Sequence, residues 1–394
     1  MSVPRLSLCM IVRNEEDCIT RCLASVQDVV DEIVIVDTGS TDKTIEICKA
    51  FGARIELFPW NDSFADARNY GIDKATGEWI LWMDADEEVD RESAALLKDD
   101  SLFAPFDVMT IHLVNYYGNK IDKHSSTDIA HTRLFRRASG IRFINKIHEC
   151  LDIVGLDEEQ IGHLPVKFHH YGYMDQVVKS KGKFERNLRL LEQQVKDNEN
   201  VYWARYYIAS EYYRNKQFQE AFDQVNLSIA AFLKEGLLPS SMVYKLKYSI
   251  LITIGSYEGA WPGIERAVAL YPDYVDLRFF MGIVLYYLEK YDSALLAFET
   301  CIEMGEDNIH HLILRGVGSF QAWHYKGLCL LKLGRTKEAL FAFLHALIIH
   351  PEYSDSLDSL AEILEENELP DLEELRKVFT EEECLIISQI IKNK

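Results

Sequence analysis

The chain contains an apolar run, Trp79–Met83, that leads into two carboxylates one residue apart, Asp84 and Asp86. Gly77 precedes the run and acidic residues follow it, so the pattern predicts a fully buried strand that ends in a turn. Carboxylates in this position lie at the edge of a parallel sheet, where open α/β folds bind ligands. Their oxygens suit a hard divalent cation, which in turn can hold a diphosphate. The feature therefore predicts a nucleotide-sugar site.

Strand and helix patterns alternate through the N-terminal part of the chain. The expected strands are Leu6–Val12, Ile33–Asp37, Arg54–Phe58 and Trp79–Met83, and later ones are Val108–Asn115 and His131–Arg136. The expected helices are Glu16–Gln27, a segment through Cys48 with Ser40 as its N-cap, and Phe64–Lys74. Alternation at this spacing predicts right-handed crossovers, a parallel sheet and an α/β fold of the Rossmann type.

From about Asp175 helical patterning replaces the alternation, and internal repeats appear. Four units place small and aromatic residues at the positions of a tetratricopeptide repeat, which has a period of about 34 residues. Their residues are Gly327, Ala339, Phe343, Ala346 and Pro351 in the unit from Trp323; Gly282, Ala294 and Phe298; Ala260, Ala267 and Pro272; and, more weakly, Ala209, Tyr212 and Ala221. The segment 307–317 is expected as an insertion between the last two units. Stacked helix pairs of this kind form a solenoid.

These changes of pattern divide the chain into three parts. Residues 1–174 are expected to form the nucleotide-sugar domain, 175–352 the helical repeats, and 353–394 an acidic helical cap. A solenoid of this kind usually binds protein or peptide. Alternatively, it stabilises the first domain or mediates self-association, and a homodimer through the repeats is one expectation.

Composition excludes several classes of partner. The formal charge of −21 argues against nucleic acid, whose phosphates require Lys and Arg, and against an anionic membrane surface. The N-terminus lacks a signal-peptide pattern, and no apolar stretch approaches the roughly 20 residues that span a bilayer. The eight cysteines are scattered without a CxxC pair, and Cys18 and Cys22, which share a helical face, are expected as buried thiols. We therefore expect a cytoplasmic protein.

Four blocks in order resemble the signature of family 2 glycosyltransferases with the GT-A fold. They are Leu8–Glu15, Ile33–Asp42, Ala67–Asn69 and Trp82–Asp86. The resemblance covers residues 5–172 and implies an inverting transfer from a nucleotide-activated sugar with a divalent metal, Mg²⁺ or Mn²⁺. A glycosidase, which paired acids would also allow, needs no nucleotide pocket or metal.

Residues at the ends of the first two expected strands have side chains suited to donor binding, which agrees with the resemblance. Asp37 can accept hydrogen bonds from a uracil edge or a ribose. Arg13 offers a cation for phosphate, and Asn14 and Glu15 offer acceptors for the base or ribose.

Further donor and metal contacts are expected after these blocks. The resemblance implies that Asp84 meets the ribose or a metal-bound water and that Asp86 binds the metal, with both carboxylates as candidate metal ligands. Arg68 adds a phosphate contact or, alternatively, forms a structural salt bridge. Trp60 stacks on the base or packs against the edge of the domain.

A third metal ligand and a catalytic base are expected later in the first domain. In related enzymes a histidine follows the last strand, and His170 matches that position better than His169 does. Inversion needs a base within hydrogen-bond reach of the acceptor. Glu149 is favoured because family 2 enzymes generally use a carboxylate, with His148 as an alternative base or acceptor-site residue; otherwise the pair organises a loop.

Two groups of relatives suggest different acceptors. One adds sugars to lipopolysaccharide core and shares the Arg133–Arg137 and His170–Tyr171 elements. The other joins a GT-A domain to tetratricopeptide helices, as in the peptide S-glycosyltransferases of glycosylated bacteriocins (sublancin and thurandacin type). The architecture favours the second, so we expect a hexose, with UDP-glucose as donor by resemblance, to be moved to Cys or Ser of a ribosomal peptide. A non-catalytic tetratricopeptide scaffold is the remaining alternative.

Overall fold

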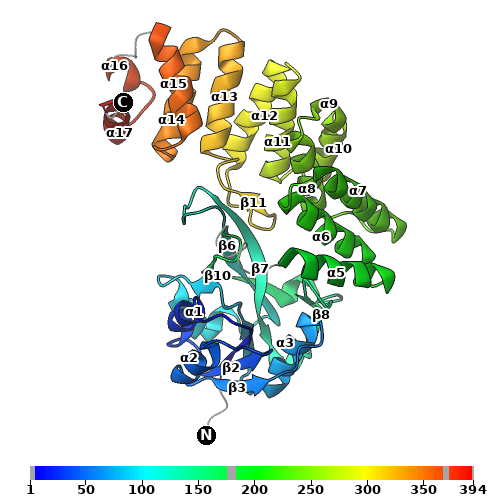
Figure 1. Cartoon of the computed structure of the whole chain (residues 1–394). Coiled ribbons are helices and arrows are strands. Elements are labelled where there is room, and N and C mark those ends of the chain that lie inside the picture. The colour runs from blue at the N-terminus through cyan, green and yellow to red at the C-terminus, as the bar shows by residue number, and fades with distance from the viewer. Residues whose placement is uncertain (1–4, 175–182, 367–371, 393–394) are drawn as a thin grey trace. The chain divides into compact units, whose positions relative to one another are not determined.

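The computed structural model describes residues 5–174, 183–366 and 372–392. They form two compact units, residues 1–238 and 239–394, and each is described by itself (Figure 1). The predicted boundary at residue 174 remains a prediction, and the change of pattern near Asp175 lies outside the described residues. The first three long helices after the sheet belong to the first unit.

The first unit contains a mixed sheet. Its strands are β1 (Leu6–Val12), β2 (Glu32–Asp37), β3 (Arg54–Leu57), β4 (Trp79–Trp82), β5 (Glu87–Val89), β6 (Val108–Tyr116), β7 (Ser126–Arg136) and β10 (Ile161–His170), in the order β3-β2-β1-β4-β7-β6-β10-β5. A separate hairpin pairs β8 (Phe143–Ile144) with β9 (Cys150–Leu151). The α/β fold of the Rossmann type is confirmed.

The expectation of a parallel sheet is correct only for the first four strands. Strands β1 to β4 run parallel, but β7 is antiparallel to both β4 and β6. Strand β10 is parallel to β6, and β5 is antiparallel to β10. No helix connects β6 to β7, so a hairpin rather than a crossover joins them, and the parallel order ends there.

Helices cover both faces of the parallel strands. They are α1 (Ile19–Val26), α2 (Thr44–Ala50) and α3 (Phe64–Lys74). Alternate β1 residues point to opposite sides: Leu8 and Met10 join Leu23 of α1 in one apolar core, whereas Cys9 joins Ile72 of α3 in the other. Because the helices cover the faces of the sheet, the carboxyl ends of the strands remain available for the candidate active site.

The predicted N-cap at Ser40 is wrong. Helix α2 begins at Thr44, after Lys43, and Asp42 accepts hydrogen bonds from the backbone and hydroxyl of Thr44 at 3.0 and 2.6 Å. The hydroxyl of Ser40 instead accepts from the backbone N–H of Asn14 at 3.0 Å. Ser40 therefore joins the loops after β1 and β2.

Paired helices follow the sheet. Those of the first unit are α5 (Lys183–Lys196), α6 (Val201–Arg214) and α7 (Phe218–Lys234). Those of the second unit are α8 (Ser241–Thr253), α9 (Tyr257–Ala260), α10 (Gly263–Leu270), α11 (Val275–Tyr287), α12 (Tyr291–Met304), α13 (Phe320–Lys332), α14 (Thr336–Ile349), α15 (Ser354–Glu366), α16 (Leu372–Leu375) and α17 (Glu381–Lys392). In Figure 1 the helices α11 to α14 stack side by side as successive pairs.

Small residues bring the paired helices of the second unit together, as the repeat pattern predicts. A Cβ atom added at Gly282 would lie 2.7 Å from the ring of Phe298, and one added at Gly327 would lie 2.6 Å from that of Phe343. The expected insertion contains β11 (Ile313–Leu314). Among the described residues, no helix is long and apolar enough to cross a membrane.

Candidate active site

The turn between β4 and β5 carries the two aspartates that the sequence singles out. All four residues of β4 are buried, and Met83 carries the chain to Asp84 at the edge of the sheet. The side chain of Glu87 accepts a hydrogen bond from the backbone N–H of Asp84 at 3.0 Å, and the N–H of Glu87 donates to the carbonyl of Asp84 at 3.1 Å. These reciprocal bonds fix the turn that presents Asp84 and Asp86.

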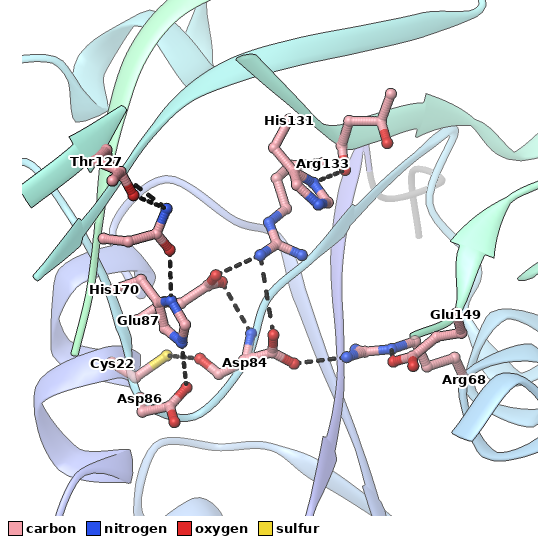
Figure 2. Close-up of polar contacts among 12 residues, drawn as sticks. Cys22, Arg68, Asp84, Asp86, Glu87, Thr127, His131, Arg133, Glu149 and His170 are labelled. Atoms are coloured by element: carbon pink, nitrogen blue, oxygen red, sulfur yellow. Dashed lines mark hydrogen bonds and ion pairs between the residues drawn. The ribbon is translucent and has the colours of Figure 1, made fainter. Parts of the chain in front are cut away.

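Arg68 joins Asp84 to Glu149 (Figure 2). Its Nη2 donates to Asp84 Oδ1 at 2.5 Å, and its Nε donates to Glu149 Oε1 at 2.6 Å. Arg68 comes from α3, whose N-cap Ser63 accepts from the backbone of Asp66. The structure thus brings together three residues that lie 16 and 81 positions apart in the sequence.

A second arginine, Arg133 on β7, approaches the same turn. It forms an ion pair with the buried Glu87, and its Nη2 lies 3.8 Å from Asp84 Oδ2. Its guanidinium group also stacks over the ring of Trp82 at 3.6 Å. No role was predicted for Arg133 from the sequence, although it lies within the Arg133–Arg137 element. The sequence offers no local signal for this contact, because β7 is rich in polar residues and contains a second arginine, Arg136.

The two arginines set the charge of the aspartate. Burial alone would raise the pKa of Asp84, but the cations of Arg68 and Arg133 hold it well below its usual range. Burial raises the pKa of Glu87, and Arg133 opposes that shift. Asp84 is therefore a carboxylate at physiological pH.

Asp86 faces His170 on the other side of the turn. His170 ends β10, and its Nε2 lies 3.6 Å from Asp86 Oδ1. Its Nδ1 donates to Asn115 Oδ1 at 2.8 Å, which orients the ring toward Asp86. His169 points to the opposite face, where its Nδ1 pairs with the hydroxyl of Tyr116 at 2.9 Å. The geometry therefore favours His170 over His169 as a partner of Asp86.

These residues fit a divalent cation by their chemistry. In the described part of the chain, no group of three or more His, Cys, Asp or Glu side chains has the geometry of a complete metal site. A Cβ atom at Gly172 would lie 2.5 Å from His170 Nε2 and 2.6 Å from Asp86 Oδ2, so glycine leaves space beside this pair. Asp86 supplies carboxylate oxygens and His170 an imidazole nitrogen, and both are donor types that divalent cations accept.

The predicted donor-binding residues meet at the neighbouring strand ends. Val12 and Asp37 are paired in register, so the loops that follow them are adjacent. The buried carboxylate of Asp37 accepts from the backbone of Gly39 and Ser40 at 3.0 and 3.1 Å. Asp37 therefore shapes its own loop.

The loop after β1 is joined to the loop after β2. Asn14 has a left-handed backbone (φ 55°), and its side chain accepts from the N–H of Thr41 at 2.8 Å. The N–H of Glu15 donates to Thr44 Oγ1 at 2.7 Å. Arg13, between β1 and these contacts, is exposed.

Trp60 lies beside α3. Its Nε1 donates to Asp62 Oδ1 at 3.0 Å, and its ring packs edge-on against Phe64 at 4.8 Å. Packing at the edge of the domain thus accounts for the contacts of Trp60, and stacking on a base remains a prediction.

His148 and Glu149 point to different neighbours although they are adjacent in sequence. Glu149 faces Arg68, whereas the ring of His148 stacks on Tyr207 of α6 at 3.9 Å, with 6° between the planes. Burial, with Arg214 and Arg186 nearby, lowers the pKa of His148 to about 3. A neutral imidazole this weak is a poor proton acceptor near pH 7. Glu149, which faces Arg68, remains the predicted base.

Comparison with known proteins relates two parts of this chain to protein families. Residues 7–153 match the family model for glycosyl transferase family 2, and residues 320–353 match that for the tetratricopeptide repeat. The chain therefore contains a family 2 glycosyltransferase domain and, C-terminal to it, a tetratricopeptide repeat.

None of the eight cysteines, all within the described ranges, forms a disulfide.

Individual relatives align with long stretches of the chain. The chain is 35% identical over 204 residues to a TPR repeat-containing protein of Synechococcus elongatus, a match that covers 50% of this chain and 49% of that protein. It is 28% identical over 299 residues to the SPbeta prophage-derived glycosyltransferase SunS of Bacillus subtilis, covering 72% and 67% of the two chains. The chain thus spans about half the length of the first of these relatives. Among solved structures, S. aureus TarS 1–349 aligns with a TM-score of 0.34 at 17% identity, over 62% of this chain and 86% of that one.

Proposed function

We propose that the protein is an inverting, metal-dependent glycosyltransferase that moves a hexose from a UDP-sugar, with UDP-glucose as the favoured donor, to a cysteine or serine side chain of a ribosomally made peptide. The observation that carries the proposal is the placement of Asp86 and His170 beside the Asp84–Arg68–Glu149 array at the edge of the sheet. The family 2 domain over residues 7–153 supports it.

Asp86 and His170 would hold Mg²⁺ or Mn²⁺, with Asn115 orienting the histidine ring from behind. When bound, the cation supplies Lewis-acid stabilisation of the charge that develops on the departing diphosphate. Asp84, kept ionised by Arg68 and Arg133, accepts hydrogen bonds from the ribose or from water near the ion. The loops that carry Arg13, Asn14, Glu15 and Asp37 would enclose the nucleoside, and Trp60 lies at the edge of the domain.

Glu149 takes the acceptor proton in this proposal. The thiol S–H gives its proton to the Glu149 carboxylate, the sulfur forms the bond to the anomeric carbon, and the carbon–oxygen bond to UDP breaks with its electron pair on UDP. Arg68 fixes the carboxylate in place through Nε. A cysteine thiol needs less help from a base than a hydroxyl group does, because the pKa of the thiol is already about 8.5.

The peptide acceptor rests on architecture and resemblance. A family 2 domain and a tetratricopeptide repeat occur in one chain, as in the peptide S-glycosyltransferases of glycosylated bacteriocins that the motifs resemble. The similarity to the glycosyltransferase SunS, over 72% of this chain, agrees with that resemblance. Self-association through the repeats and a cytoplasmic location remain predictions.

Mass spectrometry of acceptor panels tests the proposal. The full chain is incubated with UDP-glucose, Mn²⁺ and matched peptides that differ only in Cys, Ser or Ala at one position. We expect a hexose mass increment on the Cys peptides, a smaller one or none on Ser, and none on Ala. Donor turnover without any increment on peptides, but with transfer to lipopolysaccharide core or another glycan, would assign the enzyme to a different acceptor. Donor turnover that is no greater in wild type than in Asp86→Ala would favour a non-catalytic scaffold.

A further inference from the structure

The residues between β8 and β9 form a hairpin loop, residues 145–149, with unusual backbone. Asn145 and His148 both have left-handed backbone, with φ of 69° and 48°. A histidine in this region is uncommon, and such conformations persist where the surroundings over-determine them. The hairpin itself supplies few constraints, because β8 and β9 have two residues each.

Helices α5 and α6 supply an apolar anchor for this loop. Ile147, at the loop's centre, is only 4% exposed and belongs to one buried cluster with residues of both helices. Its buried partners are Leu190 and Leu191 of α5 and Ala204 and Ile208 of α6. The loop thus inserts a side chain into the core of the first helical pair.

Polar and aromatic contacts hold the loop on both sides of Ile147. Asn200 Nδ2, at the start of α6, donates to Asn145 Oδ1 at 3.3 Å, and Lys146 Nζ lies 3.6 Å from Asp197 Oδ2. The ring of His148 lies flat on that of Tyr207. Four consecutive loop residues therefore contact the α5–α6 region.

The opposite side of the loop faces the glycosyltransferase domain. The carbonyl of Lys146 accepts from the N–H of Phe64 at 2.8 Å, and Glu149 accepts from Arg68. The loop is therefore enclosed between α3 and the α5–α6 pair, and its last residue is the carboxylate that meets the Asp84–Arg68 array.

We propose that the α5–α6 pair is a clamp that positions the catalytic loop, with Tyr207 and Ile147 as positioning residues for Glu149. In this view, the first helices after the sheet are part of the active site's support rather than a detachable peptide-binding repeat. The catalytic part of this inference rests on the proposed function, whereas the structural part does not.

Two variants of one tyrosine, with a matched control, test the clamp. Tyr207→Ala removes the ring that supports His148, and Tyr207→Phe keeps it. Tyr202→Ala removes a tyrosine from the same helix whose ring packs on Phe232 of α7 instead. Hydrogen exchange of residues 143–151 and steady-state kinetics are measured on the full chain.

We expect Tyr207→Ala, but neither Tyr207→Phe nor Tyr202→Ala, to increase exchange in residues 143–151 at least tenfold. The same variant should lower kcat by about 10- to 100-fold with the KM for the UDP-sugar within twofold of wild type. Ile147→Ala should reproduce both effects.

Unchanged exchange in Tyr207→Ala would overturn the clamp whether or not an acceptor has been found. Faster exchange with unchanged kcat would show that the clamp is structural only and would overturn the positioning role. Equal kinetic losses in Tyr207→Ala and Tyr202→Ala would also overturn it. If wild type transfers no sugar, the proposed function fails while the exchange result still decides the clamp.

Discussion

The guanidinium group of Arg68 donates to Asp84 Oδ1 at 2.5 Å and, with its Nε, also holds Glu149. Arg68 is buried, so its guanidinium group joins the two carboxylates with little access to solvent of its own. The array connects the β4–β5 turn, α3 and the 145–149 loop, and its geometry depends on one residue.

Arg68→Met is expected to lower the free energy of unfolding by about 3 kcal/mol, because it removes the buried cation that joins the carboxylates of Asp84 and Glu149. Arg68→Lys should recover part of the stability but little of the activity, since an ammonium group cannot donate in a fork to two carboxylates. Urea unfolding and donor turnover check both variants. Equal stability of Arg68→Met and wild type would contradict the description of this array.

Gly172→Ala tests the space beside Asp86 and His170. The added Cβ atom would lie within 2.6 Å of a side-chain atom of each residue, so we expect both to be displaced. Mn²⁺ affinity in the presence of UDP should fall by about 10- to 100-fold, the size of effect seen when groups around metal ligands are disturbed. Isothermal titration measures the affinity, and thermal unfolding controls for stability. Undiminished Mn²⁺ binding would show that the cation does not use this space.

The stability of the protein should decrease on mild acidification, in part through His148. Its pKa is about 3 in the folded chain and about 6.5 when unfolded, so between these values the unfolded state binds the extra proton. Stability therefore falls as pH decreases below about 6.5, and at pH 5 this one group contributes a loss of about 2 kcal/mol.

His148→Asn isolates that contribution, since asparagine tolerates the left-handed backbone at this position. The difference in unfolding free energy between pH 7 and pH 5 should be smaller in the variant than in wild type. An identical difference in the two proteins would mean that His148 titrates normally when folded.

Gly327→Ala should destabilise the second unit. The new methyl group would press on the ring of Phe343, and overpacking of this kind costs about 1–3 kcal/mol, offset by about 1 kcal/mol of helix propensity. Adding Phe343→Leu should make the glycine substitution less harmful, because the smaller side chain leaves room. Strictly additive effects in this double-mutant cycle would argue against direct contact.

Local patterns in the sequence account for much of the fold. The apolar run through Trp82 predicts β4 and places Asp84 at the edge of the sheet, because a short apolar stretch between a glycine and acidic residues allows few other structures. The glycines Gly282 and Gly327 likewise predict close helix pairs, because each leaves room for a phenylalanine ring of the next helix.

Relationships between distant residues could not be read from local patterns. The Arg133–Glu87 ion pair depends on β7 running antiparallel to β4, and alternation of strands and helices predicts only the parallel half of the sheet. Ser40 has the chemistry of an N-cap, but Asp42, two residues later, accepts the hydrogen bond from the backbone of Thr44 at the start of α2. The insertion of Ile147 between α5 and α6 has no signature in the loop itself.

The central claim is that Asp86 and His170 bind a divalent cation together with the donor nucleotide. Its most direct test is the titration of UDP into wild type and Asp86→Asn, each with and without Mn²⁺. We expect Mn²⁺ to tighten UDP binding to wild type by at least tenfold. We expect Asp86→Asn to abolish this enhancement while leaving metal-free UDP binding in place. Enhancement of the same size in Asp86→Asn would contradict the claim.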